Sequence, residues 1–118
     1  MAKSKVERIG VGKRMSQAAI HGDTVYLAGV VADDPVPSVA KQTKQILASI
    51  DKVLKQAGTD KSRILKANIW LSDIRTFDEM NKVWDKWVSK GNTPARATVE
   101  SRLAGPQYLV EIMVTAAR

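Results

Sequence analysis

The amino-acid sequence predicts an α+β fold in which a mixed, mostly antiparallel sheet carries two helices on one face. Residues 39–57 and 77–88 have apolar side chains at spacings of three and four, which is typical of amphipathic helices. Five or six shorter segments are rich in β-branched residues or alternate apolar with polar residues, as strands do. The chain has 118 residues, so we expect one domain over residues 1–118.

The N-terminal segments are predicted to form strands. Residues 5–9 fit an edge strand, and residues 16–20 and 24–28 fit the two arms of a hairpin. His21-Gly22-Asp23 lies between these arms and is a turn signal, so we expect His21 to be an exposed turn residue.

The first helix is predicted to begin after a break at Pro35 and Pro37, which lack backbone donors, and to end at Gly58. Its apolar stripe consists of Val39, Thr43, Ile46, Leu47, Ile50, Val53, Leu54 and Ala57.

The remaining elements alternate between strand and helix. Residues 64–72 predict a strand whose buried face holds Leu65, Ala67, Ile69 and Leu71. Thr76-x-x-Glu79 matches a capping box, which predicts the start of the second helix. On that helix Trp84 and Trp87 share the apolar side, and we interpret both as core residues. Residues 93–101 and 108–117 predict the last two strands.

The opposite face of the predicted sheet has nothing in the chain to cover it. Val110, Ile112 and Val114 alternate with Glu111, Met113 and Thr115, so the last strand has two faces of different chemistry. We therefore expect a homo-oligomer with cyclic symmetry.

Composition excludes several classes of function. The chain has no cysteine and one histidine, so we expect no metal site. No apolar run approaches the roughly 20 residues of a membrane span, and the first residues lack the apolar core of a secretory signal, so we expect a cytoplasmic protein. The net charge is +7, but the basic residues are scattered and aromatic residues make up 5%, which argues against nucleic acid as a partner.

Candidate chemistry gathers in the C-terminal third. Arg96, Glu100 and Arg102 lie along one predicted strand, and Glu111 lies on the next. Charged side chains within apolar strands must be paired or face a cleft. The residues allow two interpretations, structural ion pairs or an anion clamp in which arginine grips a carboxylate and a glutamate orients water.

The sequence resembles the RidA (YjgF) family of reactive-intermediate deaminases over nearly its whole length. The most specific part is Pro94-Ala95-Arg96-Ala97-Thr98-Val99-Glu100, followed eleven residues later by Glu111. The other matching segments are Gln17-Ala18, Val25-Tyr26-Leu27-Ala28-Gly29, residues 42–54, Lys66-Ala67-Asn68-Ile69-Trp70-Leu71, Phe77-x-x-Met80-Asn81 and Val110-Glu111-Ile112.

The resemblance implies a chorismate-mutase-like fold and a homotrimer with ligand clefts between subunits. It also implies hydrolysis of small 2-imino or enamine carboxylic acids to 2-oxo acids and ammonia, without a cofactor. The partner would be a small carboxylate metabolite.

The resemblance also implies roles for individual residues. Arg102 would bind the substrate carboxylate, Glu111 would orient water or move a proton, Gly29 would offer its backbone amide, and Asn81 would line the cleft.

Three positions depart from the family pattern. Leu103 occupies the usual place of the arginine, and Met15 stands roughly where deaminating members have a tyrosine. Ala28-Gly29 replaces a serine–glycine pair, so a hydroxyl is lost. A trimeric metabolite-binding protein without catalysis is therefore the alternative, and a nucleic-acid or translation-related activity, which the resemblance also allows, is the third hypothesis.

Overall fold

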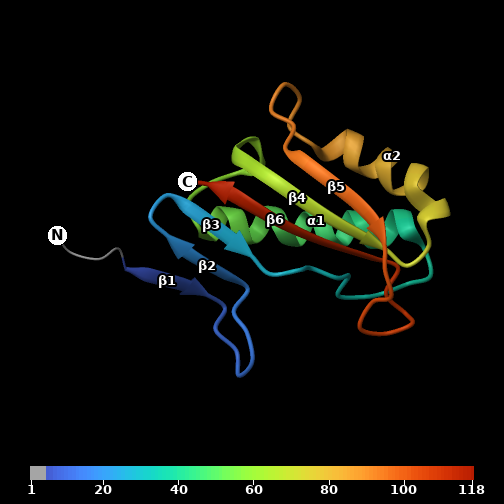
Figure 1. The fold of residues 1–118 in the computed structure, drawn as a ribbon, viewed down its shortest axis with the longest axis horizontal. Coiled ribbons are helices and arrows are strands. Elements are labelled where there is room, and N and C mark those ends of the chain that lie inside the picture. Colours follow the sequence, from blue (N-terminus) through green and yellow to red (C-terminus); the bar gives the residue numbers. More distant parts are fainter. Residues whose placement is uncertain (1–4) are drawn as a thin grey trace.

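The computed structural model describes residues 5–118, which form a six-stranded mixed sheet with two α-helices (Figure 1). This architecture confirms the predicted α+β class. The elements are β1 (Val6–Ile9), β2 (Ala18–His21), β3 (Thr24–Leu27), α1 (Val39–Gln56), β4 (Ile64–Leu71), α2 (Phe77–Trp87), β5 (Ala95–Glu100) and β6 (Val110–Ala117).

The strand order is β1-β2-β3-β6-β4-β5. All neighbouring strands are antiparallel except β4 and β5, which are parallel and joined by α2. Two parallel strands run in the same direction, so the chain must return to the starting end of the sheet between them. A helix such as α2 makes this return, whereas a tight turn would make the next strand antiparallel. The last strand, β6, therefore lies in the middle of the sheet, where both of its edges are paired.

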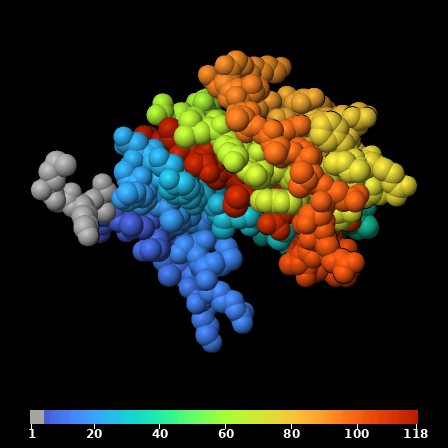
Figure 2. Space-filling view, in the orientation of Figure 1, coloured from blue at the N-terminus to red at the C-terminus, as the bar shows by residue number. Residues whose placement is uncertain are grey.

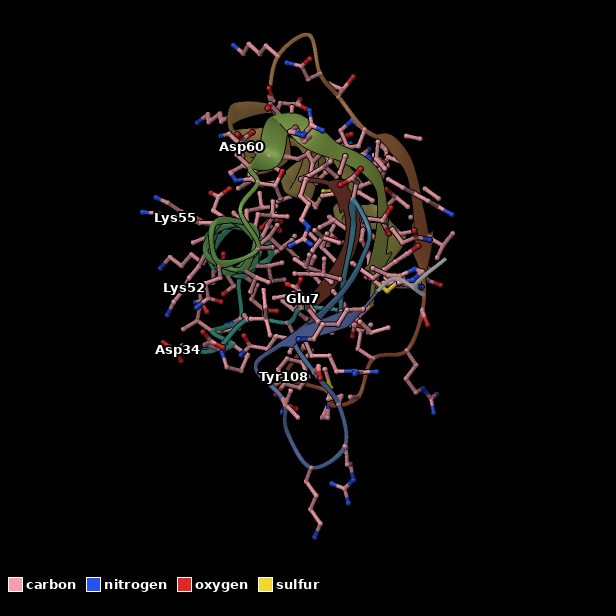
Figure 3. The ribbon with its side chains drawn as sticks, turned by 90° about the vertical axis from the view of Figure 1, so that its left-hand side faces the viewer. Glu7, Asp34, Lys52, Lys55, Asp60 and Tyr108 are labelled. Carbon is pink, nitrogen blue, oxygen red and sulfur yellow. The ribbon has the colours of Figure 1, made fainter. Side chains whose placement is uncertain are left out.

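The core lies between the sheet and the two helices. The side chains of β6 that face α1 are almost fully buried, with Val110 and Ile112 at 0% exposure. Ile46, Ile50 and Leu54 of α1 are equally buried against them. Lys52 and Lys55 point away from the sheet (Figure 3), so the predicted apolar stripe does face the core. Each such aliphatic side chain contributes about 1.5–3 kcal/mol by burial.

The prediction that Leu65 belongs to the buried face of β4 is wrong. The pairing of β4 with β6 shifts register between Ile64 and Lys66. This irregularity turns Leu65 outward, where it is 54% exposed, and Ile64 is buried at 5% exposure in its place. A bulge inserts one extra residue and so breaks the alternation on which the prediction relied.

The predicted capping box at the start of α2 is also wrong. The Thr76 hydroxyl donates to the Asp73 carbonyl (2.7 Å), and Thr76 makes no side-chain cap bond. A 3₁₀ turn, Ile74–Thr76, precedes the helix and gives Thr76 a non-extended backbone (φ −90°, ψ 10°). Glu79 instead accepts from the Ala40 N–H (3.1 Å) and so ties the first turn of α2 to that of α1.

The face of the sheet opposite the helices is uncovered within the chain (Figure 2). Tyr26 is 51% exposed and Val99 is 49% exposed. Trp70 of β4 and Met113 of β6 lie between them and are half-buried. Trp70 pairs with Glu111, and Met113 pairs with Asn68. Over residues 5–118, neither helix is both long and apolar enough to cross a membrane.

Candidate functional site

Glu111 and Gly29 are in direct contact. Val30 forms an isolated antiparallel bridge with Ile112 through two hydrogen bonds of 2.8 and 3.0 Å. This bridge places Gly29, just beyond β3, beside Glu111 on β6. A Cβ atom at position 29 would overlap the Glu111 carboxylate, so only glycine allows this approach.

The backbone amide of Gly29 remains available as a donor. Its N–H donates to no group within residues 5–118, and Gly29 is exposed. A carboxylate and a free N–H are therefore adjacent, so one can accept a proton while the other donates a hydrogen bond.

A hollow of about 360 Å³ adjoins this contact. Gly29 and Met15 both line it, so two of the expected site residues meet there. Met15 extends from the loop at residues 10–17 and is 58% exposed. Lys52 of α1 and Asp33 also line this hollow, so it carries one positive and one negative side chain.

Arg102 and Leu103 line a different hollow, of about 650 Å³, together with Ser72, Glu100 and Tyr108. Strand β5 ends at Glu100, so both residues belong to the loop at residues 101–109. Successive side chains point to opposite faces of the sheet only within a strand. Arg102 and Leu103 lie beyond the end of β5, and both line the same hollow.

Arg102 is exposed and forms no salt bridge within residues 5–118. Glu100, by contrast, accepts a hydrogen bond from the Ile74 N–H (3.0 Å). The guanidinium of Arg102 is therefore free to bind an anion.

A single chain does not place Arg102 and Glu111 in the same hollow. Glu111 pairs with Trp70 of β4, and β4 in turn pairs with β5, which carries the loop of Arg102. One strand thus lies between the two residues. The loops at residues 10–17 and 101–109 extend from the same side of the sheet but stand apart (Figure 2).

Asn81 lies away from both hollows, between α2 and β5. Its Oδ1 accepts from Nη1 of Arg96 (2.8 Å). The guanidinium of Arg96 also lies 5.2 Å from the ring centre of Trp84 and 5.8 Å from that of Phe77. Burial lowers the pKa of Arg96, and Asp85 partly offsets this effect. Arg96 is therefore held by an amide and two rings rather than by a carboxylate.

Gln42 is a residue that the sequence analysis missed. It is 0% exposed, and its Nε2 donates to the carbonyls of Val36 (2.8 Å) and Gln107 (3.0 Å). Its Oε1 accepts from the Leu109 N–H (2.9 Å). Gln42 thereby fixes the loop of Arg102 to α1. A glutamine within an otherwise apolar helical stripe was the signal that could have identified it.

His21, Trp84 and Trp87 lie in the surroundings that the sequence predicted for them. His21 is exposed at the end of β2, as predicted for a turn histidine. Trp84 is 5% exposed in the core, and Trp87 packs against the core from its edge. Within residues 5–118, no three histidine, cysteine or acidic side chains cluster closely enough to hold a metal ion.

Together, these features describe a small α+β protein with one candidate anion-binding hollow, that of Arg102, and an open sheet face. The chain belongs to the endoribonuclease L-PSP family, also called the RidA, YjgF or RutC family, whose family model matches residues 6–118.

Relatives and solved structures agree on this family. A RutC family protein of Haemophilus ducreyi is 46% identical over 112 residues, 95% of this chain and 96% of its own. A 2-iminobutanoate/2-iminopropanoate deaminase of Rattus norvegicus is 36% identical over 91 residues, 72% of this chain and 66% of its own. A YjgF family protein from Neisseria meningitidis superposes with a TM-score of 0.94 at 42% identity, covering 97% of this chain and 95% of its own.

Proposed function

We propose that this protein hydrolyses small 2-imino acids and their enamine tautomers to 2-oxo acids and ammonia. The observation that carries the proposal is the Glu111 carboxylate lying against Gly29, whose N–H is free. The rat relative named as a 2-iminobutanoate/2-iminopropanoate deaminase supports the choice of substrate.

Three groups perform the reaction. Arg102 binds the substrate carboxylate with two parallel hydrogen bonds. Glu111 accepts a proton from water as the water oxygen adds to the C=N carbon. The carbinolamine then collapses: Glu111 gives its proton to the nitrogen, the C–N bond breaks to release ammonia, and the hydroxyl loses its proton to the Glu111 carboxylate as the C=O bond of the 2-oxo acid forms. The Gly29 N–H hydrogen-bonds the bound substrate.

No cofactor is needed for this chemistry. A protonated imine carbon is already electrophilic, so the protein must only position the substrate and handle protons.

The complete site forms between chains of a homotrimer. Arg102 of one chain and Glu111 of the next line a shared cleft, which explains why Glu111 does not line the hollow of Arg102 within one chain. The uncovered sheet face, with Tyr26 and Val99 about half exposed, supports burial against other copies. Sedimentation at micromolar protein should show a trimer, and a monomer would contradict the shared cleft.

Ammonia release from freshly generated 2-iminopropionate, measured above the uncatalysed rate, tests the activity. We expect acceleration by the protein and its loss in Arg102→Ala. The matched control is Arg63→Ala, because Arg63 is exposed and lines neither hollow. Equal turnover in Arg102→Ala and Arg63→Ala would remove Arg102 from the mechanism. A folded trimer without acceleration would refute the deaminase and favour a metabolite-binding protein.

A further inference from the structure

The helix side of the molecule carries a groove that the proposed deaminase does not use. It lies between α1 and α2, has a volume of about 560 Å³, and is lined by residues of these two helices. Its apolar surface is formed by Leu47, Val83 and Trp87. The hollows of Arg102 and Gly29 share no residue with it.

The groove exists because α1 presents small side chains to α2. Ala40 and Ala48 lie two turns apart on the same side of α1 and both line the groove. Opposite them, the indole N–H of Trp87 donates to Asp51 (2.9 Å), which fixes the ring at the groove edge.

The groove also carries more positive than negative side chains. Lys44, Lys82 and Lys86 line it, and none forms a salt bridge within residues 5–118. The acidic residues of the groove are already engaged: Asp51 accepts from Trp87, and Glu79 accepts from the Ala40 N–H. The three lysines outnumber these two carboxylates, so the groove has a net charge of +1, and none of its ammonium groups is in a salt bridge with another described residue.

We propose that this groove binds an amphipathic carboxylate, with its apolar body on Leu47, Val83 and Trp87 and its carboxylate at the lysines. A neutral apolar molecule would leave the lysines unused, and a small hydrophilic anion would leave the apolar surface uncovered. A concave apolar site with few polar groups at its rim is the usual form of a small-molecule site.

Decanoate, used well below micelle-forming concentrations, is the probe. Its binding is followed by the indole N–H resonance of Trp87 in ¹⁵N-labelled protein, assigned with Trp87→Phe. We expect a saturable shift of this resonance and none of the Trp70 resonance, because Trp70 lies on the opposite face of the sheet. Decyltrimethylammonium, with the same tail and opposite charge, should bind at least tenfold more weakly.

Two pairs of variants separate the apolar and the charged contributions. Ala48→Leu fills the groove and should abolish the Trp87 shift, whereas Ala48→Ser keeps the space and should bind as the wild type does. Lys44→Ala with Lys82→Ala should weaken decanoate at least fivefold. The control pair, Lys41→Ala with Lys55→Ala, removes the same charge from outside the groove and should leave affinity unchanged.

Several results would overturn the proposal. The first is that decanoate and decyltrimethylammonium bind equally well. The second is that Ala48→Leu binds decanoate as the wild type does, in a protein whose urea midpoint shows that it is folded. The third is that both pairs of lysine variants weaken decanoate binding equally. A Trp87 resonance that moves with protein concentration but not with decanoate would assign the groove to another copy of the chain instead. None of these readouts depends on imine hydrolysis, so this proposal and the proposed function can fail separately.

Discussion

Gln42 offers the most direct test of how the fold holds its candidate anion-binding loop. Replacing Gln42 with Leu preserves the size of a buried side chain but removes three hydrogen bonds to the carbonyls of Val36 and Gln107 and the N–H of Leu109. The latter two groups belong to the loop of Arg102. We therefore expect Gln42→Leu to destabilise the fold and to loosen that loop.

The expected magnitude follows from the three bonds. Each contributes about 1 kcal/mol net, and each backbone group left buried without a partner costs about 1–3 kcal/mol. Because these groups are only partly buried, water recovers some of the loss, and the added apolar surface of leucine offsets more. We expect a loss of about 2–4 kcal/mol in the free energy of unfolding, a large share of the 5–15 kcal/mol typical of a domain.

Urea unfolding at a fixed protein concentration measures this loss, since assembly would otherwise alter the midpoint. The matched control is Gln45→Leu, one turn along α1. Gln45 also bonds a loop backbone, at the N–H (3.0 Å) and carbonyl (2.8 Å) of Asp34, but these bonds are exposed. It should lose less than about 1 kcal/mol because water replaces its partners. Equal losses in the two variants would refute the argument that burial makes Gln42 important.

Three further changes test other contacts. Gly29→Ala should displace the Glu111 carboxylate and lower imine hydrolysis at least tenfold with little change in the urea midpoint; wild-type turnover would contradict the site. Arg96→Met should lower the free energy of unfolding by about 1–2 kcal/mol, since it loses a hydrogen bond and two ring contacts, and an unchanged midpoint would show that they contribute nothing. Hydrogen bonds from Arg75 lower the pKa of Asp73 below its usual value of 3.8, so the contribution of Asp73 to stability is present above that pH and is lost as the pH falls through the folded-state pKa. Between about pH 6 and about pH 2.5, the urea midpoint of Asp73→Asn should therefore fall less than that of the wild type. An equal fall in the two proteins would contradict this pH dependence.

The sequence predicted the helices and most strands because their periodicity belongs to a single segment. The stripe that includes Ile46 and Ile50 needs only the α1 sequence to identify its buried side. The prediction for Leu65 failed because its orientation depends on how β4 pairs with β6, about 50 residues away along the chain. The capping box failed for a similar reason: Glu79 bonds the backbone of α1 rather than that of its own helix.

The candidate site was less predictable than the fold. The contact of Glu111 with Gly29 depends on the bridge of Val30 with Ile112, which no local pattern encodes. The partners of Gln42 lie 6, 65 and 67 residues away along the chain. The sequence identified charged residues that could act, but only the tertiary structure shows which backbone groups hold them in place.

Within one chain Arg102 lines a hollow that Glu111 does not reach, which leads to a test of the shared cleft. Arg102→Ala and Glu111→Gln should each be inactive alone, because each lacks one required group. If a site takes Arg102 from one chain and Glu111 from another, trimers refolded from a 1:1 mixture will contain some intact sites. Each intact site needs the right chain at two positions, each with a chance of one half, so about a quarter of wild-type activity should return. If both residues act within one chain, every site in the mixture lacks one of them, and the absence of any recovery in folded mixed trimers would refute the shared cleft.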